Sequence, residues 1–202
     1  MRALILVDLQ YDFLPGGALA VPRGDEVLPV AAALAARFET VVATQDWHPP
    51  GHASFAAEHP GHAVGEVIEL EGLPQVLWPV HCVQGTRGAE LAVVDAARLA
   101  AVFPKGTNPR IDSYSGFFDN GHRQATGLGD WLAARGVNEV VVLGLATDYC
   151  VKWTALDAVG LGFQTTFVED GSRGVELAPG DVARAIAEMA AAGVRIAQSS
   201  EV

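Results

Sequence analysis

The sequence predicts an α/β protein with a doubly wound, mostly parallel six-stranded sheet and helices on both faces, a three-layer α/β/α arrangement. Two observations lead to this fold class. Short apolar runs rich in β-branched residues recur along the chain, and amphipathic or alanine-rich segments separate them. Runs buried on both faces suit parallel strands, and a strand followed by a helix, repeated, is the pattern of a doubly wound sheet.

The expected strands and helices alternate along the chain. Each expected strand is a run of mainly apolar residues, and the six runs are residues 3–9, 40–46, 99–105, 139–146, 163–170 and 194–199. The expected helices are residues 26–38, 88–98, 124–135, 148–159 and 179–192. One helix therefore falls between each pair of successive strands.

Two irregular stretches interrupt this alternation. Residues 47–86 show no long helical pattern, but they hold five of the six histidines together with Pro and Gly. A loop of this length is usually functional or disordered, and its His, Trp and Phe content favours function. Residues 105–121, KGTNPRIDSYSGFFDNG, hold aromatic side chains that we expect to close over a cleft.

The composition fits one domain and excludes two classes of partner. A chain of 202 residues, of which 50% are hydrophobic, is long enough to bury a sizeable core. The formal net charge of -11 argues against nucleic acid and anionic membranes, because both bind basic surfaces. No nucleic-acid or membrane partner is therefore expected.

The N-terminal residues and the cysteines indicate a cytoplasmic protein. The opening residues MRALILVDLQ place Asp8 in a short apolar run, which is unlike a secretory signal. No stretch reaches the ~18 continuous apolar residues of a membrane span. Cys82 and Cys150 are the only cysteines, and in a reducing compartment we expect no disulfide between them.

Four of the expected strands end in a chemically capable residue. Asp8 lies near the end of the first expected strand, and Lys105 ends the third. Asp46 and His48 stand at the end of the second, and a turn after the fourth leads to Cys150. In an open α/β sheet, ligands bind outside the carboxyl ends of the strands. These residues are therefore the first candidates for a functional site.

Cys150 has two interpretations. Thr147 or Asp148 can cap a helix whose first turn contains the thiol. The helix dipole and a nearby cation would then lower the pKa of the thiol from about 8.5 to about 3.5–7.5, which is typical of a nucleophile. The alternative is that Cys150 is simply a small buried apolar residue. The residues around it decide between the two.

Asp8 and Lys105 are those residues. A carboxylate at the end of the run LILV is costly to bury unless it is paired, although it could instead cap the following turn. Lys105 could neutralise Asp8, or it could be a solvated surface lysine. If both converge with Cys150, the carboxylate accepts the thiol proton, the lysine stabilises both anions, and the thiolate becomes the nucleophile.

Asp46 and His48 have the spacing of metal ligands. They are two residues apart on an extended segment, so they point to the same side. One carboxylate with neutral imidazoles suits a borderline divalent ion such as Zn²⁺, Mn²⁺ or Fe²⁺. The alternative is that the pair only forms hydrogen bonds.

A third metal ligand must come from elsewhere, and the candidates are His52, His59, His62 and His81. His81 is the strongest candidate because Trp78 and Pro79 give it a fixed, partly apolar setting. His59 and His62 have the character of exposed loop residues. Cys82, which adjoins His81, is expected to be a buried thiol rather than a ligand.

The segments that hold these residues resemble one protein family. They are LVDLQYDFLPGGALAVPRGD, TQDWHPPGHASF, LWPVHCVQGTRGAEL, FPKGTNPRIDSYSGFFDNG and GLATDYCVKWTALDA. In this order they are similar to the nicotinamidases of the cysteine amidohydrolase group, whose broader superfamily includes the isochorismatases. The resemblance covers nearly the whole chain and implies a single isochorismatase-like hydrolase domain over residues 1–202.

The resemblance also implies an activity. Nicotinamidases hydrolyse nicotinamide to nicotinate and ammonia, a step of NAD salvage, through a cysteine thioester, and a divalent metal ion anchors the pyridine nitrogen. Zn²⁺ is the first expectation for this ion, with Mn²⁺ and Fe²⁺ as alternatives. Nicotinamide is the expected small-molecule partner, pyrazinamide is a further candidate substrate, and a homo-oligomer is compatible with this function.

The family's site residues can be assigned to matching positions. The positions that match the catalytic triad are Asp8, Lys105 and Cys150. The positions that match the protein metal ligands are Asp46, His48 and His81, and His52 lies where some relatives supply a further ligand.

The resemblance also assigns the substrate-binding residues. Phe13 and Trp78 match the aromatic residues that hold the pyridine ring. The peptide bond between Leu145 and Ala146 matches a cis bond that would aim backbone N–H groups at the substrate oxygen. The resemblance therefore implies an oxyanion hole formed by Ala146 and Cys150.

Two other functions remain open from the residues alone. A related metal-dependent cysteine amidohydrolase would use the same triad on another small amide or carbamoyl compound. A non-catalytic flavodoxin-like domain for binding or metal storage would use Cys150 and Lys105 structurally. An aspartyl phosphatase is excluded, because VDLQYD lacks the second aspartate two residues after Asp8 that such enzymes use.

Overall fold

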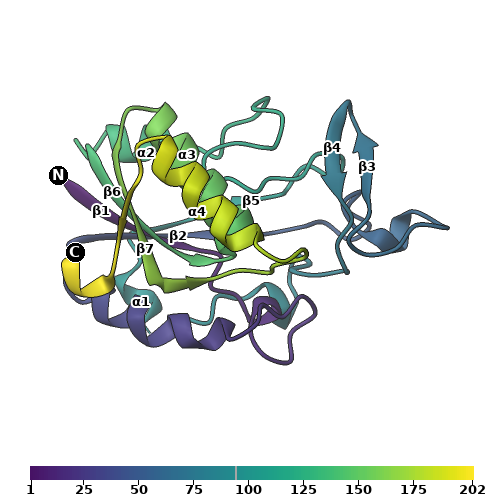
Figure 1. Ribbon diagram of the computed structural model, residues 1–202, viewed down its shortest axis with the longest axis horizontal. Coiled ribbons are helices and arrows are strands. Elements are labelled where there is room, and N and C mark those ends of the chain that lie inside the picture. Colours follow the sequence, from purple (N-terminus) through teal and green to yellow (C-terminus); the bar gives the residue numbers. More distant parts are fainter. Residues whose placement is uncertain (94) are drawn as a thin grey trace.

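The computed structural model describes residues 1–93 and 95–202 and contains the expected parallel sheet at its centre (Figure 1). Its strands are β1 (Arg2–Val7), β2 (Thr40–Asp46), β5 (Ala101–Lys105), β6 (Glu139–Leu145), β7 (Gln164–Arg173) and β8 (Arg195–Ala197). Within the described residues they form one six-stranded sheet in the order β5-β2-β1-β6-β7-β8. Every neighbouring pair is parallel, which confirms the predicted doubly wound α/β fold.

Helices cover both faces of this sheet. The α-helices are α1 (Val27–Ala35), α2 (Leu128–Ala133), α3 (Lys152–Gly160) and α4 (Asp181–Ala191). In Figure 1, α1 lies on one side of the sheet, and α3 and α4 lie on the other. Buried residues of α2, α3 and α4 share one apolar core, whereas those of α1 belong to a second core. The protein therefore has the three layers that the sequence predicts.

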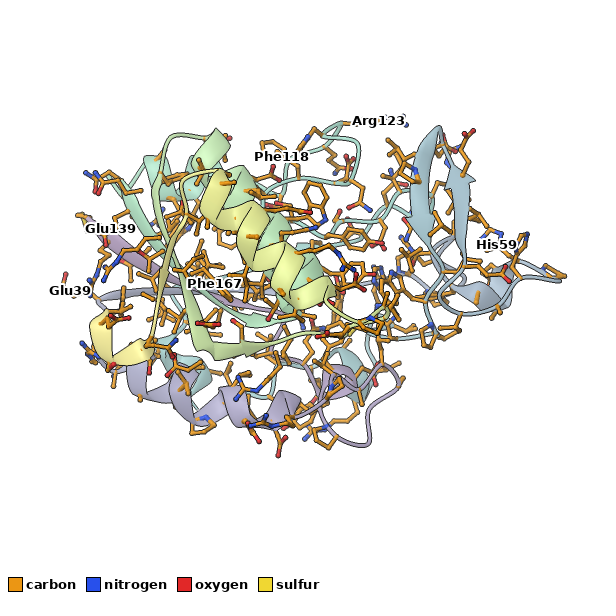
Figure 2. All side chains as sticks on the ribbon, viewed as in Figure 1. Glu39, His59, Phe118, Arg123, Glu139 and Phe167 are labelled. Atoms are coloured by element: carbon orange, nitrogen blue, oxygen red, sulfur yellow. The ribbon has the colours of Figure 1, made fainter. Side chains whose placement is uncertain are left out.

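The alternation of side chains along β1 explains the two cores. Leu4 and Leu6 pack with α1, while Ala3, Ile5 and Val7 pack on the opposite face of the sheet. All five are buried, so β1 is covered from both sides, as an apolar parallel strand requires. Figure 2 shows the side chain of Phe167 inside the molecule and that of Glu39 at its edge.

The helix expected over residues 88–98 is wrong. The structure has two short 3-10 turns there, Arg87–Ala89 and Ala96–Arg98, and position 94 of the expected helix lies outside the described residues. Besides the hydrogen bonds within these two turns, backbone groups of this segment bond to the N-terminal loop. The amide of Ala92 donates to Leu9 at 2.7 Å, and that of Tyr11 donates to Glu90 at 3.2 Å.

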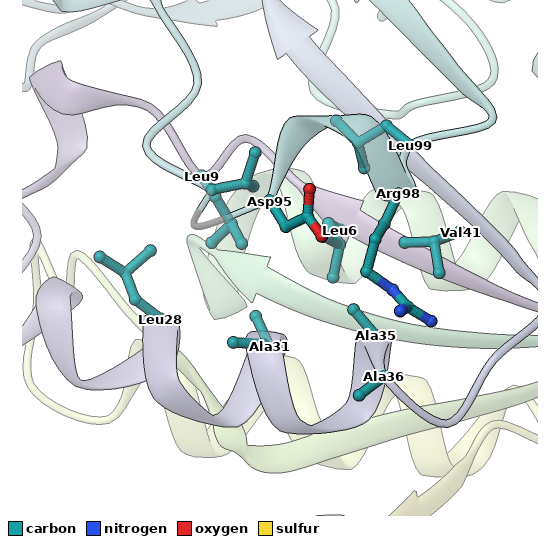
Figure 3. A pocket seen from close by; sticks show the side chains of 12 residues that line it. Leu6, Leu9, Leu28, Ala31, Ala35, Ala36, Val41, Asp95, Arg98 and Leu99 are labelled. Atoms are coloured by element: carbon teal, nitrogen blue, oxygen red, sulfur yellow. The ribbon is translucent and has the colours of Figure 1, made fainter.

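An apolar cavity of about 290 Å³ lies beside this segment (Figure 3). Leu28 and Ala31 of α1 line one side of it, and Leu99 lines the other. Leu6 of β1 also contributes to its wall, so the cavity lies over the sheet face that α1 covers.

The remaining elements are short. The first irregular stretch contains an antiparallel hairpin of β3 (Val67–Leu70) and β4 (Leu73–Val76), which projects from the body of the molecule (Figure 1). Further 3-10 turns are Tyr11–Phe13, Gly24–Glu26, Ala56–Glu58 and Ser199–Glu201. Among residues 1–93 and 95–202, the structure contains no helix long and apolar enough to cross a membrane.

The close packing of β1 against β6 at Gly144 can be tested by substitution of this glycine. Its φ is +134°, and a Cβ added there would lie 2.1 Å from the carbonyl oxygen of Val7. We expect Gly144→Ala to lower the free energy of unfolding by about 3 kcal/mol, because the two paired backbones must separate. Gly136 is the control, since its φ is +68° but no atom lies within 4 Å of an added Cβ. Gly136→Ala should cost only about 1 kcal/mol of backbone strain. Equal losses in urea denaturation would contradict the packing argument.

Candidate active site

The expected strand-end residues meet at one edge of the sheet. Asp8 follows β1, Asp46 and Lys105 end the adjacent strands β2 and β5, and Cys150 follows β6. Lys105 is central: its Nζ lies 2.8 Å from Asp8 Oδ2, 2.5 Å from Asp46 Oδ1 and 3.3 Å from Cys150 Sγ. Asp8, Lys105 and Cys150 therefore lie together, which is the condition on which the interpretation of Cys150 as a nucleophile depends.

Lys105 is a buried cation, with 1% of its surface exposed. It also donates a hydrogen bond of 2.8 Å to the carbonyl of Ser113. Burial opposes its charge, but Asp46 and Asp8 outweigh burial and raise the pKa of Lys105 well above its usual value. The ammonium group therefore stays charged between the two carboxylates.

Asp8 is held in a fully buried position at the point where β1 ends. Its φ of 49° is in the left-handed region, which turns the chain out of the strand. Thr44 of β2 donates a hydrogen bond of 2.6 Å to Asp8 Oδ1 and accepts one of 3.2 Å from the Asp8 amide. Burial raises the pKa of Asp8 to about 6, although Lys105 acts against this. The second oxygen, Oδ2, contacts the Lys105 ammonium group and has no further hydrogen-bond partner among the described residues.

Cys150 is buried, and its electrostatic setting differs from the expected one. Burial, together with the charges of Asp8 and Asp46, raises the pKa of the thiol well above its usual value, although Lys105 lowers it. The lowered pKa that the first interpretation of Cys150 implies is therefore wrong, because burial and the two carboxylates outweigh the effect of Lys105. Cys150 Sγ and a carboxylate oxygen of Asp8 lie within 4.8 Å of each other.

The turn that carries Cys150 also differs from the expected helix start. Thr147–Val151 forms a π-helical turn before α3, and its N-cap residue, Ala146, contributes no side-chain cap. The side chain of Asp148 instead accepts hydrogen bonds from the amides of Val175 and Glu176, at 3.0 and 2.7 Å. The expected capping of this helix by Thr147 or Asp148 is therefore wrong.

Asp46, His48 and His81 turn one atom each towards a common point. Asp46 Oδ2 lies 3.7 Å from His48 Nε2 and 3.8 Å from His81 Nε2. His48 Nδ1 lies 3.0 Å from the carbonyl oxygen of Gly106, and His81 Nδ1 lies 2.7 Å from that of Pro79. Since a carbonyl oxygen only accepts, both Nδ1 atoms carry a proton and donate it. The Nε2 lone pairs are therefore available.

The geometry of this cluster fits a metal ion. Ligand atoms bound tetrahedrally with bonds of about 2.1 Å lie about 3.4 Å apart, close to the separations observed here. His48 Nε2 is buried without a hydrogen-bond partner in the described part of the chain. Lys105 holds Asp46 Oδ1, and Asp46 keeps a pKa well below its usual value although burial opposes ionisation. The carboxylate is thus charged, with one oxygen left over for an ion.

The other histidine candidates differ from these two. His52 is buried beside His48, but its Nε2 lies 2.8 Å from the carbonyl of Asn108 and its Nδ1 lies 2.8 Å from Ser54 Oγ. Protein groups therefore occupy both ring nitrogens of His52. His59 Nε2 bonds to the carbonyl of Ala53, and His62 pairs with Glu66 at the surface.

The two cysteines are unpaired within the described residues, and Cys82 is fully buried. Its amide donates a hydrogen bond of 2.7 Å to Asp12 Oδ2, and burial raises the pKa of its thiol far above the usual value. Cys82 therefore has the buried, inert character that the sequence indicates.

A pocket adjoins Cys150 and the Asp46 cluster. Its apolar wall includes Phe13 and Trp78, the two residues expected to hold a ring. Ala146 also lines it, and the Leu145–Ala146 peptide bond is cis, as the resemblance implies. The predicted ring-binding residues, oxyanion residue and nucleophile thus surround one space.

Two tyrosines, Tyr114 and Tyr149, also line this pocket, although neither was named as a site residue from the sequence. Tyr149 packs edge-on against Trp78, with ring centroids 4.8 Å apart, and Tyr114 accepts a hydrogen bond of 3.3 Å from the Trp78 indole. Tyr114 comes from the second irregular stretch, whose aromatic residues were expected to close over a cleft. The position of Tyr149, directly before Cys150, is the signal that could have identified it.

Known proteins are similar to this chain in sequence and in fold. A sequence profile of the isochorismatase domain matches residues 2–201. The nicotinamidase of Escherichia coli strain K12 is 53% identical over an alignment 200 positions long, and the alignment covers 96% of this chain and 93% of that protein.

Two solved structures are also similar. The Acinetobacter baumanii nicotinamidase and pyrazinamidase is 47% identical with a TM-score of 0.96, and the match covers 99% of this chain and 97% of that one. The pyrazinamidase of Pyrococcus horikoshii, solved in complex with zinc, is 39% identical with a TM-score of 0.81, and the match covers 98% of each chain.

Thr44 provides a test of how the Asp8 charge is controlled. We expect Thr44→Val, which keeps the side-chain shape, to raise the pKa of Asp8 above its value of about 6, because the hydrogen bond to its charged form is lost. The midpoint can be followed by carbon NMR of labelled aspartate carboxyls during a pH titration. Thr165→Val, which removes a hydroxyl that donates to the Phe163 carbonyl, should leave the midpoint unchanged. A midpoint that stays constant or falls in Thr44→Val would contradict the assignment.

Proposed function

The chain belongs to the isochorismatase family, its relatives there include several nicotinamidases, and we propose that it hydrolyses nicotinamide to nicotinate and ammonia. Family membership makes it a hydrolase that acts on an amide bond. One observation carries the choice of mechanism: the thiol of Cys150 lines a pocket with aromatic walls, and the buried ammonium group of Lys105 contacts both this thiol and the buried carboxylate of Asp8. A small planar amide is the substrate class that this pocket suits.

The pocket holds the substrate through its ring. Phe13 and Trp78 are largely buried, with 6% and 4% of their surfaces exposed, so their orientation is set by packing. The Trp78 ring is further fixed by its hydrogen bond to Tyr114 and its contact with Tyr149. A pyridine ring between Phe13 and Trp78 would present its carboxamide carbon to Cys150 Sγ, and this positioning lowers the barrier for attack.

Asp8 is the general base for the first step. It accepts the Cys150 proton as sulfur attacks the carboxamide carbon, and the carbonyl π electrons move to oxygen. The backbone amides of Ala146 and Cys150 donate hydrogen bonds to that oxyanion, and loss of one such donor typically costs ~3 kcal/mol. Asp8 then returns the proton to the departing nitrogen, the C–N bond breaks, and ammonia leaves a thioester on Cys150.

Asp8 also serves the second step. It accepts a proton from a water molecule that attacks the thioester carbonyl, and it returns this proton to the departing sulfur. The thiol is restored, and the product leaves as nicotinic acid, which ionises to nicotinate as its proton passes to solvent, where it protonates the released ammonia. A carboxyl group with a pKa of about 6 suits both directions of transfer, since general catalysis is most efficient when the pKa lies near the working pH.

Lys105 compensates charge throughout this cycle. Its ammonium group contacts Asp8 and Cys150, so the negative charge that passes from carboxylate to sulfur stays beside the same cation. Since the pKa of Lys105 is raised well above its usual value, it does not need to transfer a proton itself.

Asp46, His48 and His81 would hold one divalent metal ion, for which Zn²⁺ is the first candidate and Mn²⁺ and Fe²⁺ are alternatives. The free Nε2 atoms and the ionised carboxylate support this assignment. When bound, the ion supplies a Lewis-acidic point that anchors the pyridine nitrogen. His52 would join the ligands only by giving up its bond to Asn108 or to Ser54.

Ammonia release from nicotinamide tests the proposed activity. We expect the purified protein to produce ammonia and nicotinate in equal amounts, and Cys150→Ala to reduce turnover by at least about 1000-fold, because no other nucleophile replaces the thiol. Cys82→Ala is the matched control and should retain turnover. A folded, metal-loaded protein that hydrolyses a different small amide or a carbamoyl compound, but not nicotinamide, would favour the related amidohydrolase instead. Retained turnover in Cys150→Ala would exclude the mechanism.

The metal assignment is tested by His48→Ala. We expect the variant to be purified with less than a tenth of the metal that the unaltered protein carries, because the ion loses one of three protein ligands. Elemental analysis measures this loss and identifies the native ion. His62→Ala removes an exposed histidine paired only with Glu66, and it should keep its full metal content. Equal metal content in both variants would remove His48 from the ligand set.

A further inference from the structure

Gln10 is a buried amide side chain that the proposed mechanism does not use. None of its surface is exposed to solvent. Its Nε2 donates to the backbone carbonyl of Asp46 at 2.8 Å and to that of Ala89 at 2.9 Å, while its Oε1 accepts from the Asp46 amide at 2.8 Å. Both N–H hydrogens and one oxygen lone pair are therefore satisfied by backbone groups.

These bonds take the place of a missing strand. The pairing of β1 with β2 ends at Leu6 and Ala43, and β1 turns away at Asp8. On its other side, β2 continues to pair with β5 as far as Asp46 and Lys105. The primary amide of Gln10 gives Asp46 the N–H donor and the C=O acceptor that the peptide group of a neighbouring strand would provide.

The backbone position of Asp46 determines what its carboxylate does. One oxygen accepts a hydrogen bond of 2.5 Å from Lys105, and the other faces His48 and His81 at 3.7 and 3.8 Å. A shift of the Asp46 backbone would therefore change the metal cluster and the lysine contact together.

We propose that Gln10 is a positioning residue for the metal site: its amide fixes Asp46 in the place from which one carboxylate oxygen reaches the ion and the other reaches Lys105. This inference rests on the proposed role of Asp46, His48 and His81 as metal ligands. Partners that orient a ligand typically change metal affinity 10- to 100-fold when they are removed, so the effect should be measurable as binding.

Gln45 provides a matched comparison. Its Nε2 donates to the same Ala89 carbonyl at 2.8 Å, and it is the direct chain neighbour of Asp46. It makes no hydrogen bond to the backbone of Asp46 in the described structure. Removal of either amide weakens the contact with Ala89, but only removal of the Gln10 amide releases Asp46.

The test measures Zn²⁺ affinity by competition with a chromogenic chelator in the full-length protein. We expect Gln10→Met, which has similar length but no amide, to bind Zn²⁺ about 10- to 100-fold more weakly than the unaltered protein. Gln45→Met should bind it normally. In the Co²⁺-loaded proteins, the visible absorption bands should shift in Gln10→Met and stay unchanged in Gln45→Met, since they report ligand geometry.

Other outcomes overturn the inference. Unchanged Zn²⁺ affinity in Gln10→Met, or equal losses in both variants, would assign Gln10 to the loop at Ala89 and not to the metal site. If Gln10→Met does not fold, Gln10→Glu keeps the side-chain size and tests the loss of the N–H donors in the same assay. Failure of the unaltered protein to bind any of Zn²⁺, Mn²⁺ and Fe²⁺ would overturn the proposed metal site and this inference together, whereas the results above leave the metal site intact.

Discussion

The site depends on one buried cation placed between two carboxylates. Separation of Lys105 from Asp8 or Asp46 would leave uncompensated charge in the interior, and the loss of one partner of a buried pair typically costs about 3–5 kcal/mol. The three residues come from the ends of β1, β2 and β5, so the register of these strands sets the distances between the charged groups. Placement of the charge is therefore a property of the sheet as well as of the side chains.

Much of this arrangement could be predicted from the sequence because parallel strands end at a common edge. Apolar runs located the strands, and the chemically capable residues at their ends had to converge once the sheet was parallel. The same reasoning failed for residues 88–98, where helical composition was outweighed by hydrogen bonds to residues 9–11. Propensity is a weak guide when a distant backbone segment offers partners.

Residues that act on the backbone or on another side chain were the hardest to identify. Thr44 and Gln10 have no unusual chemistry, and their roles arise from what lies opposite them in the folded chain. The pKa of Cys150 was misjudged for a similar reason, since burial and the neighbouring carboxylates appear only in three dimensions. Sequence patterns thus identify the reacting groups more easily than they identify the residues that hold those groups in place.

The strand order divides the site into two halves that come from separate parts of the chain. From β1 the chain adds β2 and then β5 towards one edge of the sheet. From β6 it adds β7 and then β8 towards the other edge, so the direction in which strands are added reverses between β1 and β6. Asp8 and Cys150 stand on either side of this reversal. The first half carries the base, the cation and the metal-type donors, while the second carries the nucleophile. Substitutions that adapt the first half to a new anchoring group can therefore accumulate while the turn that presents the thiol stays the same.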